Sequence, residues 1–248
     1  MGFSGCMKAS LNKFILILLV AACSSCSKPS AKKFFNAGCN KYASGDFVGA
    51  IAEYDKAILI DPNYIKAYNN RGMAKDAIKD EDGAIADYTK AIKLNPQYQF
   101  GYYNRGNAEA HLQDFAKAVL DYDRAVELNP HDSAAYLNRG NTKYRLNNYT
   151  GAIADFDKAI ELNPRYDKAY NSRAAAKNNI NDFNGAIFDC NKAIEVNPHY
   201  AEAYNNRGTA KRGLKHYDDA MADYSKAIEI NPHYTNAIYN RAEVQSLK

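Results

Sequence analysis

Prolines at a fixed interval constrain the fold of this chain more than any other feature. Six of its seven prolines lie 34 residues apart along the 248-residue sequence. They are Pro62, Pro96, Pro130, Pro164, Pro198 and Pro232. Proline has no backbone N–H and cannot continue a helix, and a single core has no reason to be interrupted at one period. The interval predicts an array of repeats and argues against a compact enzyme-like domain.

Each repeat carries two stretches of helical periodicity separated by a polar break. With proline at position 32, six repeats follow one another, and residues 235–248 form a seventh half-repeat. The repeats are 31–64, 65–98, 99–132, 133–166, 167–200 and 201–234. Aspartate or asparagine stands at position 16 in five of the six repeats, where its side chain can cap the second helix. The pattern predicts an all-α chain of helix–turn–helix repeats.

Small and aromatic residues recur at fixed positions of the repeat. Position 8 is glycine or alanine, positions 20 and 27 are alanine in all six repeats, and position 24 is aromatic except at Cys190. We expect the small residues at position 8 to let the second helix approach closely, and Cys190 to fill a small space in the core. Tyrosines at positions 4, 24 and 34 account for 14 of the 20 in the chain, so we interpret most of them as packing residues.

Together, the small residues at positions 8, 20 and 27, the aromatic residue at 24 and the proline at 32 resemble the tetratricopeptide repeat over about 218 of 248 residues. The resemblance implies a right-handed α-solenoid, with the first helix of each repeat lining a concave groove and 235–248 acting as a capping helix. It also implies a non-catalytic scaffold for a protein or peptide partner. The chain departs from the family pattern with tyrosine at position 4, arginine at position 7, mostly lysine at position 11, and Glu81 at position 17.

Arginine at position 7 and aspartate at position 23 recur together in repeats 2–6. The predicted pairs are Arg71–Asp87, Arg105–Asp121, Arg139–Asp155, Arg173–Asp189 and Arg207–Asp223. Because the helical wheel turns position 7 toward the second helix, we expect each pair to join the two helices of its repeat. The alternative is an arginine row that binds anions. For the lysines at position 11, we expect an apolar stem packed on the core and an amine in solvent.

Position 6 faces the expected groove and is asparagine in six of seven cases, with Ser172 as the exception. The asparagines are Asn36, Asn70, Asn104, Asn138, Asn206 and Asn240. The resemblance implies that they grip the backbone of an extended peptide, since an amide offers both a donor and an acceptor. Alternatively, they are polar groove residues that form hydrogen bonds within their own layer of the array.

Other side chains on the same wheel face would select the partner. Apolar anchors are expected in the N-terminal half, and lysines in repeats 2 and 5. The candidates are Phe35, Tyr42, Phe100, Tyr103, Leu137 and Tyr144 for the anchors, and Lys66 and Lys168 for the lysines. The family's clamp for a C-terminal carboxylate is not expected, because Phe100 and Ala134 interrupt the lysine row.

Residues 1–22 form a leader with an apolar run too short to span a bilayer. The small residues before Cys23 resemble a bacterial lipobox, which implies a lipid on Cys23 and a tether over 23–30. Ordinary signal-peptidase cleavage is the alternative.

Without the leader the formal charge falls from +4 to +2, because 30 bases and 28 acids remain. We therefore expect no nucleic-acid partner.

No other chemistry is predicted. Three of the five histidines occupy turn position 33, and His111 and His216 do not join them, so no metal site is expected. No catalytic residue, cofactor or small-molecule substrate is expected either. The sequence therefore predicts a non-catalytic adaptor, lipid-anchored in a bacterial cell envelope, that binds a protein or peptide. The alternative is a structural solenoid that assembles end to end.

Overall fold

The computed structural model of the protein describes residues 30–247 as two units, an N-terminal unit up to Tyr64 and a main unit from Ile65 onward. Every regular element in these residues is an α-helix, which confirms the all-α fold. The expected lipidation site Cys23 and most of the tether lie outside the described residues. Within the described part, no helix combines the length and the apolar character needed to cross a membrane.

The N-terminal unit is one helical hairpin, formed by α2 (Ala31–Ala43) and α3 (Phe47–Ile60). The side chains of Ser30 and Asp46 cap the two helices by accepting hydrogen bonds from backbone N–H groups. Gly38 lets the hairpin close, since a Cβ built at this residue would lie 2.6 Å from the ring of Tyr54. The hairpin therefore packs as the sequence predicts.

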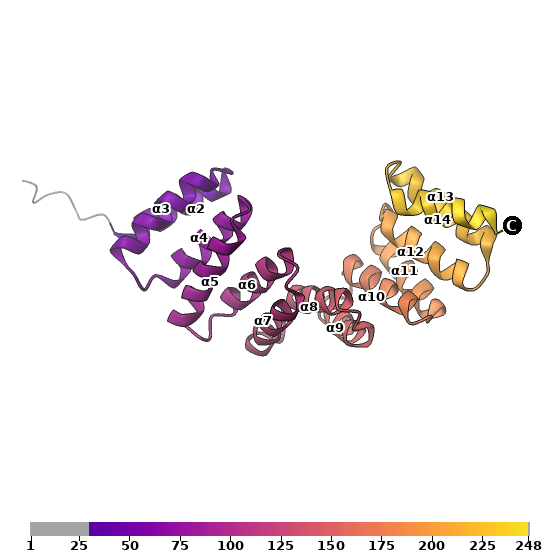
Figure 1. Ribbon diagram of the computed structural model, residues 1–248, viewed down its shortest axis with the longest axis horizontal. Coiled ribbons are helices and arrows are strands. Elements are labelled where there is room, and N and C mark those ends of the chain that lie inside the picture. Colours follow the sequence, from indigo (N-terminus) through magenta and orange to yellow (C-terminus); the bar gives the residue numbers. More distant parts are fainter. Residues whose placement is uncertain (1–29, 248) are drawn as a thin grey trace, which may run out of the picture. The chain divides into compact units, whose positions relative to one another are not determined.

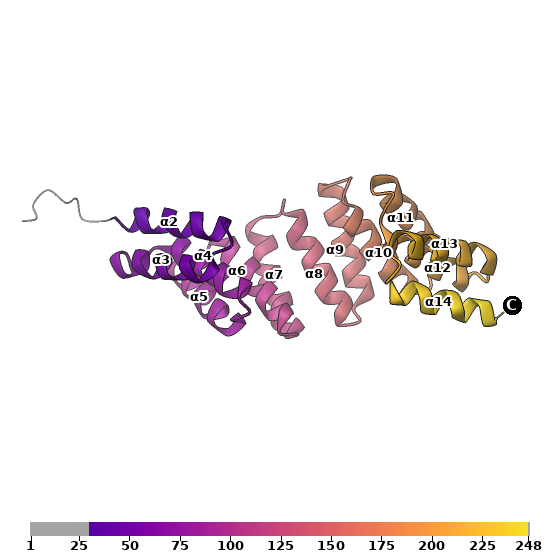
Figure 2. The ribbon, with the colours of Figure 1, turned by 90° about the horizontal axis from the view of Figure 1, so that it is seen from above.

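The main unit is a row of ten paired helices followed by a single one. The pairs are α4 (Ile65–Ala77) with α5 (Glu81–Leu94), α6 (Gln99–His111) with α7 (Phe115–Leu128), α8 (Ser133–Arg145) with α9 (Tyr149–Leu162), α10 (Asp167–Asn179) with α11 (Phe183–Val196), and α12 (Ala201–Gly213) with α13 (Tyr217–Ile230). The last helix is α14 (Thr235–Ser246). Figures 1 and 2 show these helices following one another in chain order.

Contacts within the main unit are those of a solenoid. Each first helix packs on the second helix of its repeat, each second helix packs on the next first helix, and successive first helices also touch. The last helix, α14, packs on α13 and α12 and buries Ala237 and Val244. It therefore covers the end of the array as a capping helix does.

Local sequence explains where the second helices of repeats 2–5 begin. The predicted caps at position 16 are confirmed: the side chains of Asp80, Asp114, Asn148 and Asp182 each accept a hydrogen bond from the backbone three residues later. The residue before each of these caps has a positive φ, as at Asn147 with 59°. The chain thus turns between the two helices through a left-handed residue.

The core of each repeat is a layer of alanines closed by one aromatic ring. Phe156 is completely buried, and a Cβ on Gly140 would lie 2.6 Å from its ring. In repeat 5 both partners change, because Ala174 replaces the glycine and Cys190 replaces the ring. The Cys190 side chain is completely buried as a free thiol, and burial raises its pKa. This confirms its expected role as a core residue.

Candidate functional site

The predicted Arg–Asp pairs are present in repeats 2–6 of the main unit. The arginine donates two hydrogen bonds to one carboxylate; in repeat 2, for example, Arg71 Nε and Nη2 lie 2.8 and 2.5 Å from the two oxygens of Asp87. The same arrangement joins Arg105–Asp121, Arg139–Asp155, Arg173–Asp189 and Arg207–Asp223. The guanidinium groups are thus engaged between the helices, which contradicts an arginine row available for anions.

The lysines at position 11 belong to the same cluster. The Nζ atoms of Lys75, Lys143, Lys177 and Lys211 lie 2.8, 2.8, 2.9 and 2.8 Å from the aspartate of their own repeat. The expectation that these amines reach solvent was therefore wrong. A buried carboxylate costs free energy unless it is paired, and these aspartates are paired on both sides.

Four arginines, Arg105, Arg139, Arg173 and Arg207, also reach the preceding repeat. Arg139 Nη1 donates to Asp123 at 2.8 Å, and Arg207 Nη1 donates to Asn191 at 2.7 Å. Arg105 and Arg173 make the equivalent bonds to Thr89 and Asp157. The arginine therefore links two repeats as well as two helices.

Repeat 3 breaks this pattern with Glu109 at position 11. Glu109 is 8% exposed, and its Oε2 is buried without a hydrogen-bond partner. Burial and the nearby carboxylate of Asp121 raise its pKa to about 7, against the opposing effect of Arg105. A second acid thus replaces the lysine beside a buried aspartate.

Position 6 forms a ladder of hydrogen bonds along the first helices. Asn104 Nδ2 donates to Asn69 Oδ1 at 3.0 Å, and Asn206 and Asn240 donate to Asn171 and Asn205 at 2.9 Å. Each acceptor is the position-5 residue of the preceding repeat, 35 residues earlier. These asparagines therefore have partners in the array, but in the neighbouring repeat instead of their own layer.

Asn138 lies at the centre of a more elaborate version of this ladder. Its Nδ2 donates to the hydroxyl of Tyr103 and to Oδ1 of Asn107, both at 3.0 Å, and Tyr122 Oη donates to the same Asn107 oxygen at 2.6 Å. These groups border a pocket of about 190 Å³ between α6, α7 and α8. The pocket is lined by Asn107, Ala110, His111, Tyr122, Asn138, Asn141 and Thr142.

Among the residues described, the ladder leaves the amide oxygens of four position-6 asparagines without a hydrogen bond. Within the described part of the chain, the side-chain oxygens of Asn104, Asn138, Asn206 and Asn240 accept no hydrogen bond, and none of them is a buried unpaired atom. Asn70 accepts a hydrogen bond from Asn69 at 3.2 Å, and Asn36 is exposed in the N-terminal unit. The first helices thus present amide oxygens that can accept hydrogen bonds. Each of these side chains is held in place by the hydrogen bond that its own Nδ2 group donates.

The expected apolar anchors differ in exposure. Leu137 is 5% exposed and belongs to the core cluster with Phe156, so its expected role as a groove anchor was wrong. A helical wheel drawn for one hairpin leaves out the next repeat. That repeat packs over Leu137 at position 5. Phe100, at position 2, is 53% exposed.

The remaining candidates are half-buried aromatics or exposed lysines. Tyr103 packs edge-on against Tyr122, and its hydroxyl accepts the bond from Asn138. Tyr42 and Tyr144 pack edge-on against Phe47 and Tyr149, and Phe35 packs on Tyr54 and Tyr64. Lys66 and Lys168 are exposed.

Sequence reasoning missed Asn107, which connects Asn138 and Tyr122 at the pocket. Its position 9 varies from repeat to repeat, so periodicity does not mark it. The only available signal was its place on the predicted groove face together with an amide side chain.

Comparison with known proteins agrees with this architecture. Tetratricopeptide repeat models match residues 65–98, 100–132, 133–166, 201–234 and 167–200, and a related TPR repeat model matches 40–75. No curated protein matches the chain.

Several solved structures share the fold. A tetratricopeptide repeat protein from Parabacteroides merdae ATCC 43184 has a TM-score of 0.74 at 22% identity, covering 88% of this chain and 86% of its own. YrrB, described as a TPR protein with an unusual peptide-binding site, has a TM-score of 0.66 at 21% identity, covering 76% and 97%. MamA has a TM-score of 0.63 at 26% identity, covering 68% and 92%. The chain belongs to the tetratricopeptide repeat family.

Proposed function

We propose that the protein is a non-catalytic scaffold that binds an extended peptide, or an extended segment of a partner protein, along the first helices of the main unit. The observation that carries this proposal is the ladder at position 6. Asn104, Asn206 and Asn240 are each fixed through one N–H and keep an accessible acceptor oxygen. Such oxygens can accept hydrogen bonds from the backbone N–H groups of a peptide.

The spacing of the ladder suits an extended chain. Packed helices lie about 8–10 Å apart, and an extended peptide advances about 3.3 Å per residue. Roughly every third peptide residue would therefore meet a position-6 residue, which is asparagine except at Ser172. Because this grip does not depend on the peptide's side chains, sequence preference would come from neighbours such as the exposed Phe100 and from the pocket beside Asn138.

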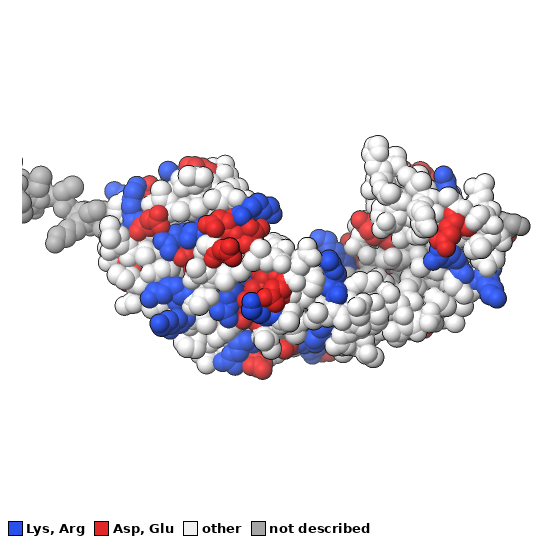
Figure 3. All heavy atoms as spheres, in the orientation of Figure 1, with Lys and Arg blue, Asp and Glu red and all other residues white. Residues whose placement is uncertain are grey.

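The surface charge favours a peptide over a polyanion. On the face drawn in Figure 3, Lys and Arg side chains of the main unit lie beside Asp and Glu side chains. The main unit also has ion pairs between exposed side chains, such as Lys192–Glu195 at 2.7 Å and Lys226–Glu229 at 2.7 Å. A mixed surface lacks the broad positive field that phosphate backbones require.

The proposal includes a membrane anchor in a bacterial cell envelope. Its support is the lipobox-like sequence before Cys23, together with the leader of residues 1–22. An eight-residue tether over 23–30 has a flexible reach of about 15 Å. A lipid on Cys23 would thus keep the scaffold close to the membrane.

Selection from a random peptide library on the purified protein tests the binding face. The affinity of the selected peptides is measured by fluorescence anisotropy for the wild-type protein and for the triple variant N104A/N206A/N240A. T150A, on the exposed surface of α9, is the control variant. We expect the triple variant to weaken binding at least about tenfold and T150A to leave it unchanged, since three hydrogen bonds of about 0.5–1.5 kcal/mol each are lost.

Equal affinity of the triple variant, with unchanged circular dichroism, would contradict the proposal. Light scattering on the same samples tests the alternative function. A mass that grows with protein concentration in the absence of peptide would favour end-to-end assembly.

A further inference from the structure

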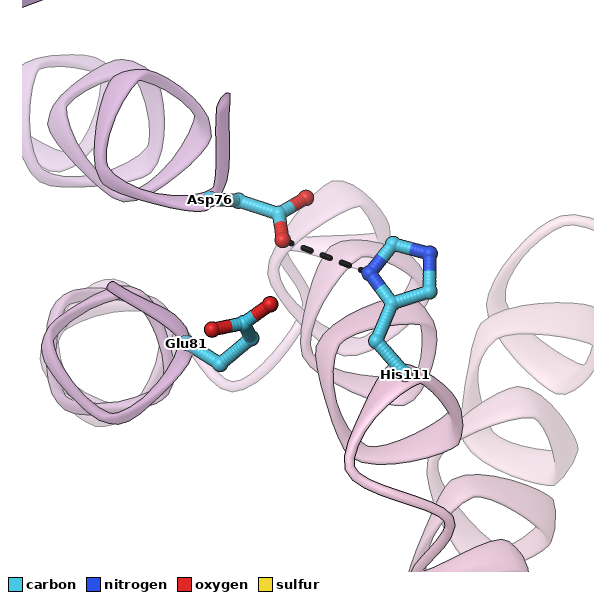
Figure 4. Close-up of side chains that lie close together, drawn as sticks. All are labelled: Asp76, Glu81 and His111. Carbon is cyan, nitrogen blue, oxygen red and sulfur yellow. Dashed lines mark hydrogen bonds and ion pairs between the residues drawn. The ribbon is translucent and has the colours of Figure 1, made fainter. Parts of the chain in front are cut away.

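Three side chains that lie apart in the sequence converge at the junction of repeats 2 and 3. Asp76 is in the last turn of α4, Glu81 is the first residue of α5, and His111 is the last residue of α6. One ligand atom from each lies within 4.8 Å of the other two, and His111 Nδ1 is 3.4 Å from Asp76 Oδ1. Figure 4 shows all three side chains directed toward one another.

The other repeats fill the same location with different chemistry. In repeat 4, positions 12 and 17 are Tyr144 and Tyr149, with ring centroids 5.4 Å apart, and Asn179 of the next repeat donates to the Tyr144 hydroxyl at 3.0 Å. Repeat 1 has the equivalent aromatic pair, Tyr42 and Phe47, at 5.2 Å. At the junction of repeats 2 and 3 all three positions are ionisable instead.

This replacement brings two carboxylates together, of which Glu81 lies at the N-terminus of α5, where the helix dipole favours it. Asp76 lies at the C-terminal end of α4, where the helix dipole disfavours a carboxylate. Among the described residues, no lysine or arginine forms an ion pair with Asp76 or Glu81. In the part of the chain that the structure describes, the imidazole of His111 is paired with Asp76, and the His111 side chain is 53% exposed.

We propose that Asp76, Glu81 and His111 bind a divalent transition-metal ion, with Zn²⁺ as the ion that fits best. One imidazole nitrogen and two carboxylate oxygens form a mixed donor set that suits zinc better than the harder Mg²⁺ or Ca²⁺. Zinc binds such atoms at about 2.0–2.2 Å, so tetrahedral ligands lie roughly 3.4 Å apart. Small rotations of these side chains, on the partly exposed surface, bring the atoms to that separation, and water completes the coordination.

A bound ion would join three helices of two repeats. It would connect the end of α4 and the start of α5 to the end of α6, across the turn that the aromatic pair closes in repeats 1 and 4. The site would therefore reinforce repeat 2 where its aromatic contact is missing. A protonated His111 held between two carboxylates is the competing explanation, and it requires no metal.

The restored aromatic pair provides the decisive variant. D76Y/E81F copies the residues found in repeat 1, so it removes both carboxylates while supplying a packing pair that the array already accommodates. H111N removes the imidazole and copies the asparagine that repeat 5 carries at this position. H216N, at the N-terminus of α13, is the matched control for a histidine outside the cluster.

Zinc binding is measured by isothermal titration calorimetry with ZnCl₂ on metal-stripped protein under reducing conditions. A parallel titration with MgCl₂ tests a harder ion. We expect the wild-type protein and H216N to bind one more zinc equivalent than D76Y/E81F, and H111N to bind it at least about tenfold more weakly. Zinc should also raise the thermal midpoint of the wild-type protein but not that of D76Y/E81F.

Equal zinc stoichiometry and affinity in the wild-type protein and both variants would overturn the proposal. Equal affinity for Mg²⁺ would also overturn it, because that result indicates loose attraction by carboxylates. If D76Y/E81F fails to fold, H111N decides by the same criterion. A His–carboxylate ion pair alone predicts that H111N lowers stability while zinc has no effect on any form of the protein.

Discussion

The aspartate at position 23 is a buried anion in every repeat of the main unit, and its neighbours decide whether that burial is tolerated. Asp155 is 3% exposed and lies between Arg139 and Lys143. Asp121 is 6% exposed and has Arg105, but Glu109 takes the place of the lysine. One exchange thus turns a compensated cluster into one with excess negative charge.

We predict that Glu109→Lys stabilises the protein by about 1–2 kcal/mol. The substitution removes a buried acid with a raised pKa and provides the amine that four other repeats place beside the aspartate. Urea unfolding at pH 7, followed by circular dichroism, measures the effect. The matched change is Lys143→Glu, which should lower stability by a similar amount. Unchanged or reduced stability of Glu109→Lys would contradict this account.

At the scale of the helix pair, the distance between the two helices depends on the residues at positions 8 and 24 together. Gly140 leaves room for the ring of Phe156, while Ala174 faces the smaller Cys190. In these two repeats the smaller residue at position 8 stands with the larger one at position 24, and the larger residue at position 8 with the smaller one at position 24. The separation of the two helices is therefore fixed by the pair and not by either residue alone.

We predict that Gly140→Ala destabilises the protein by about 1–3 kcal/mol, because the new methyl group overlaps a buried ring. In the double variant Gly140→Ala/Phe156→Cys, which copies repeat 5, the loss should be smaller than the sum of the two single losses. A double-mutant cycle from urea unfolding measures this coupling. Additive losses would show that the two positions do not determine the fit together.

Helices, caps and core layers were predictable because they depend on residues close in sequence. Asp80 caps a helix that begins at the next residue, and the proline period sets the register of the rest. Leu137 was misassigned because its burial depends on the adjacent repeat. The lysine ion pairs were missed because they join the two helices of one repeat, as between Lys75 and Asp87. The cluster of Asp76, Glu81 and His111 was missed because His111 comes from the next repeat. Such contacts join residues up to 35 positions apart, which a helical wheel cannot represent.

At the scale of the whole molecule, the scaffold is expected to work from a membrane surface. We predict that the chain expressed in a bacterium with its leader carries a diacylglyceryl group on Cys23 and partitions with membranes, since two acyl chains give stable anchoring. Fatty-acid labelling, mass spectrometry and fractionation check this. Cys23→Ser should lose the label and Cys26→Ser should keep it. An unlabelled wild-type protein cleaved after Ala22 would indicate ordinary signal-peptidase processing.

The hydrogen bond that four position-7 arginines make to the preceding repeat has a consequence for how such a chain changes in length. The partners are Thr89, Asp123, Asp157 and Asn191, three residue types that accept a hydrogen bond at one repeat position. Any of these repeats can therefore precede any other without leaving the arginine unbonded at the junction. Gain or loss of whole 34-residue segments would preserve this hydrogen bond at the new junctions, so duplication offers evolution a direct way to lengthen or shorten the face presented to a partner.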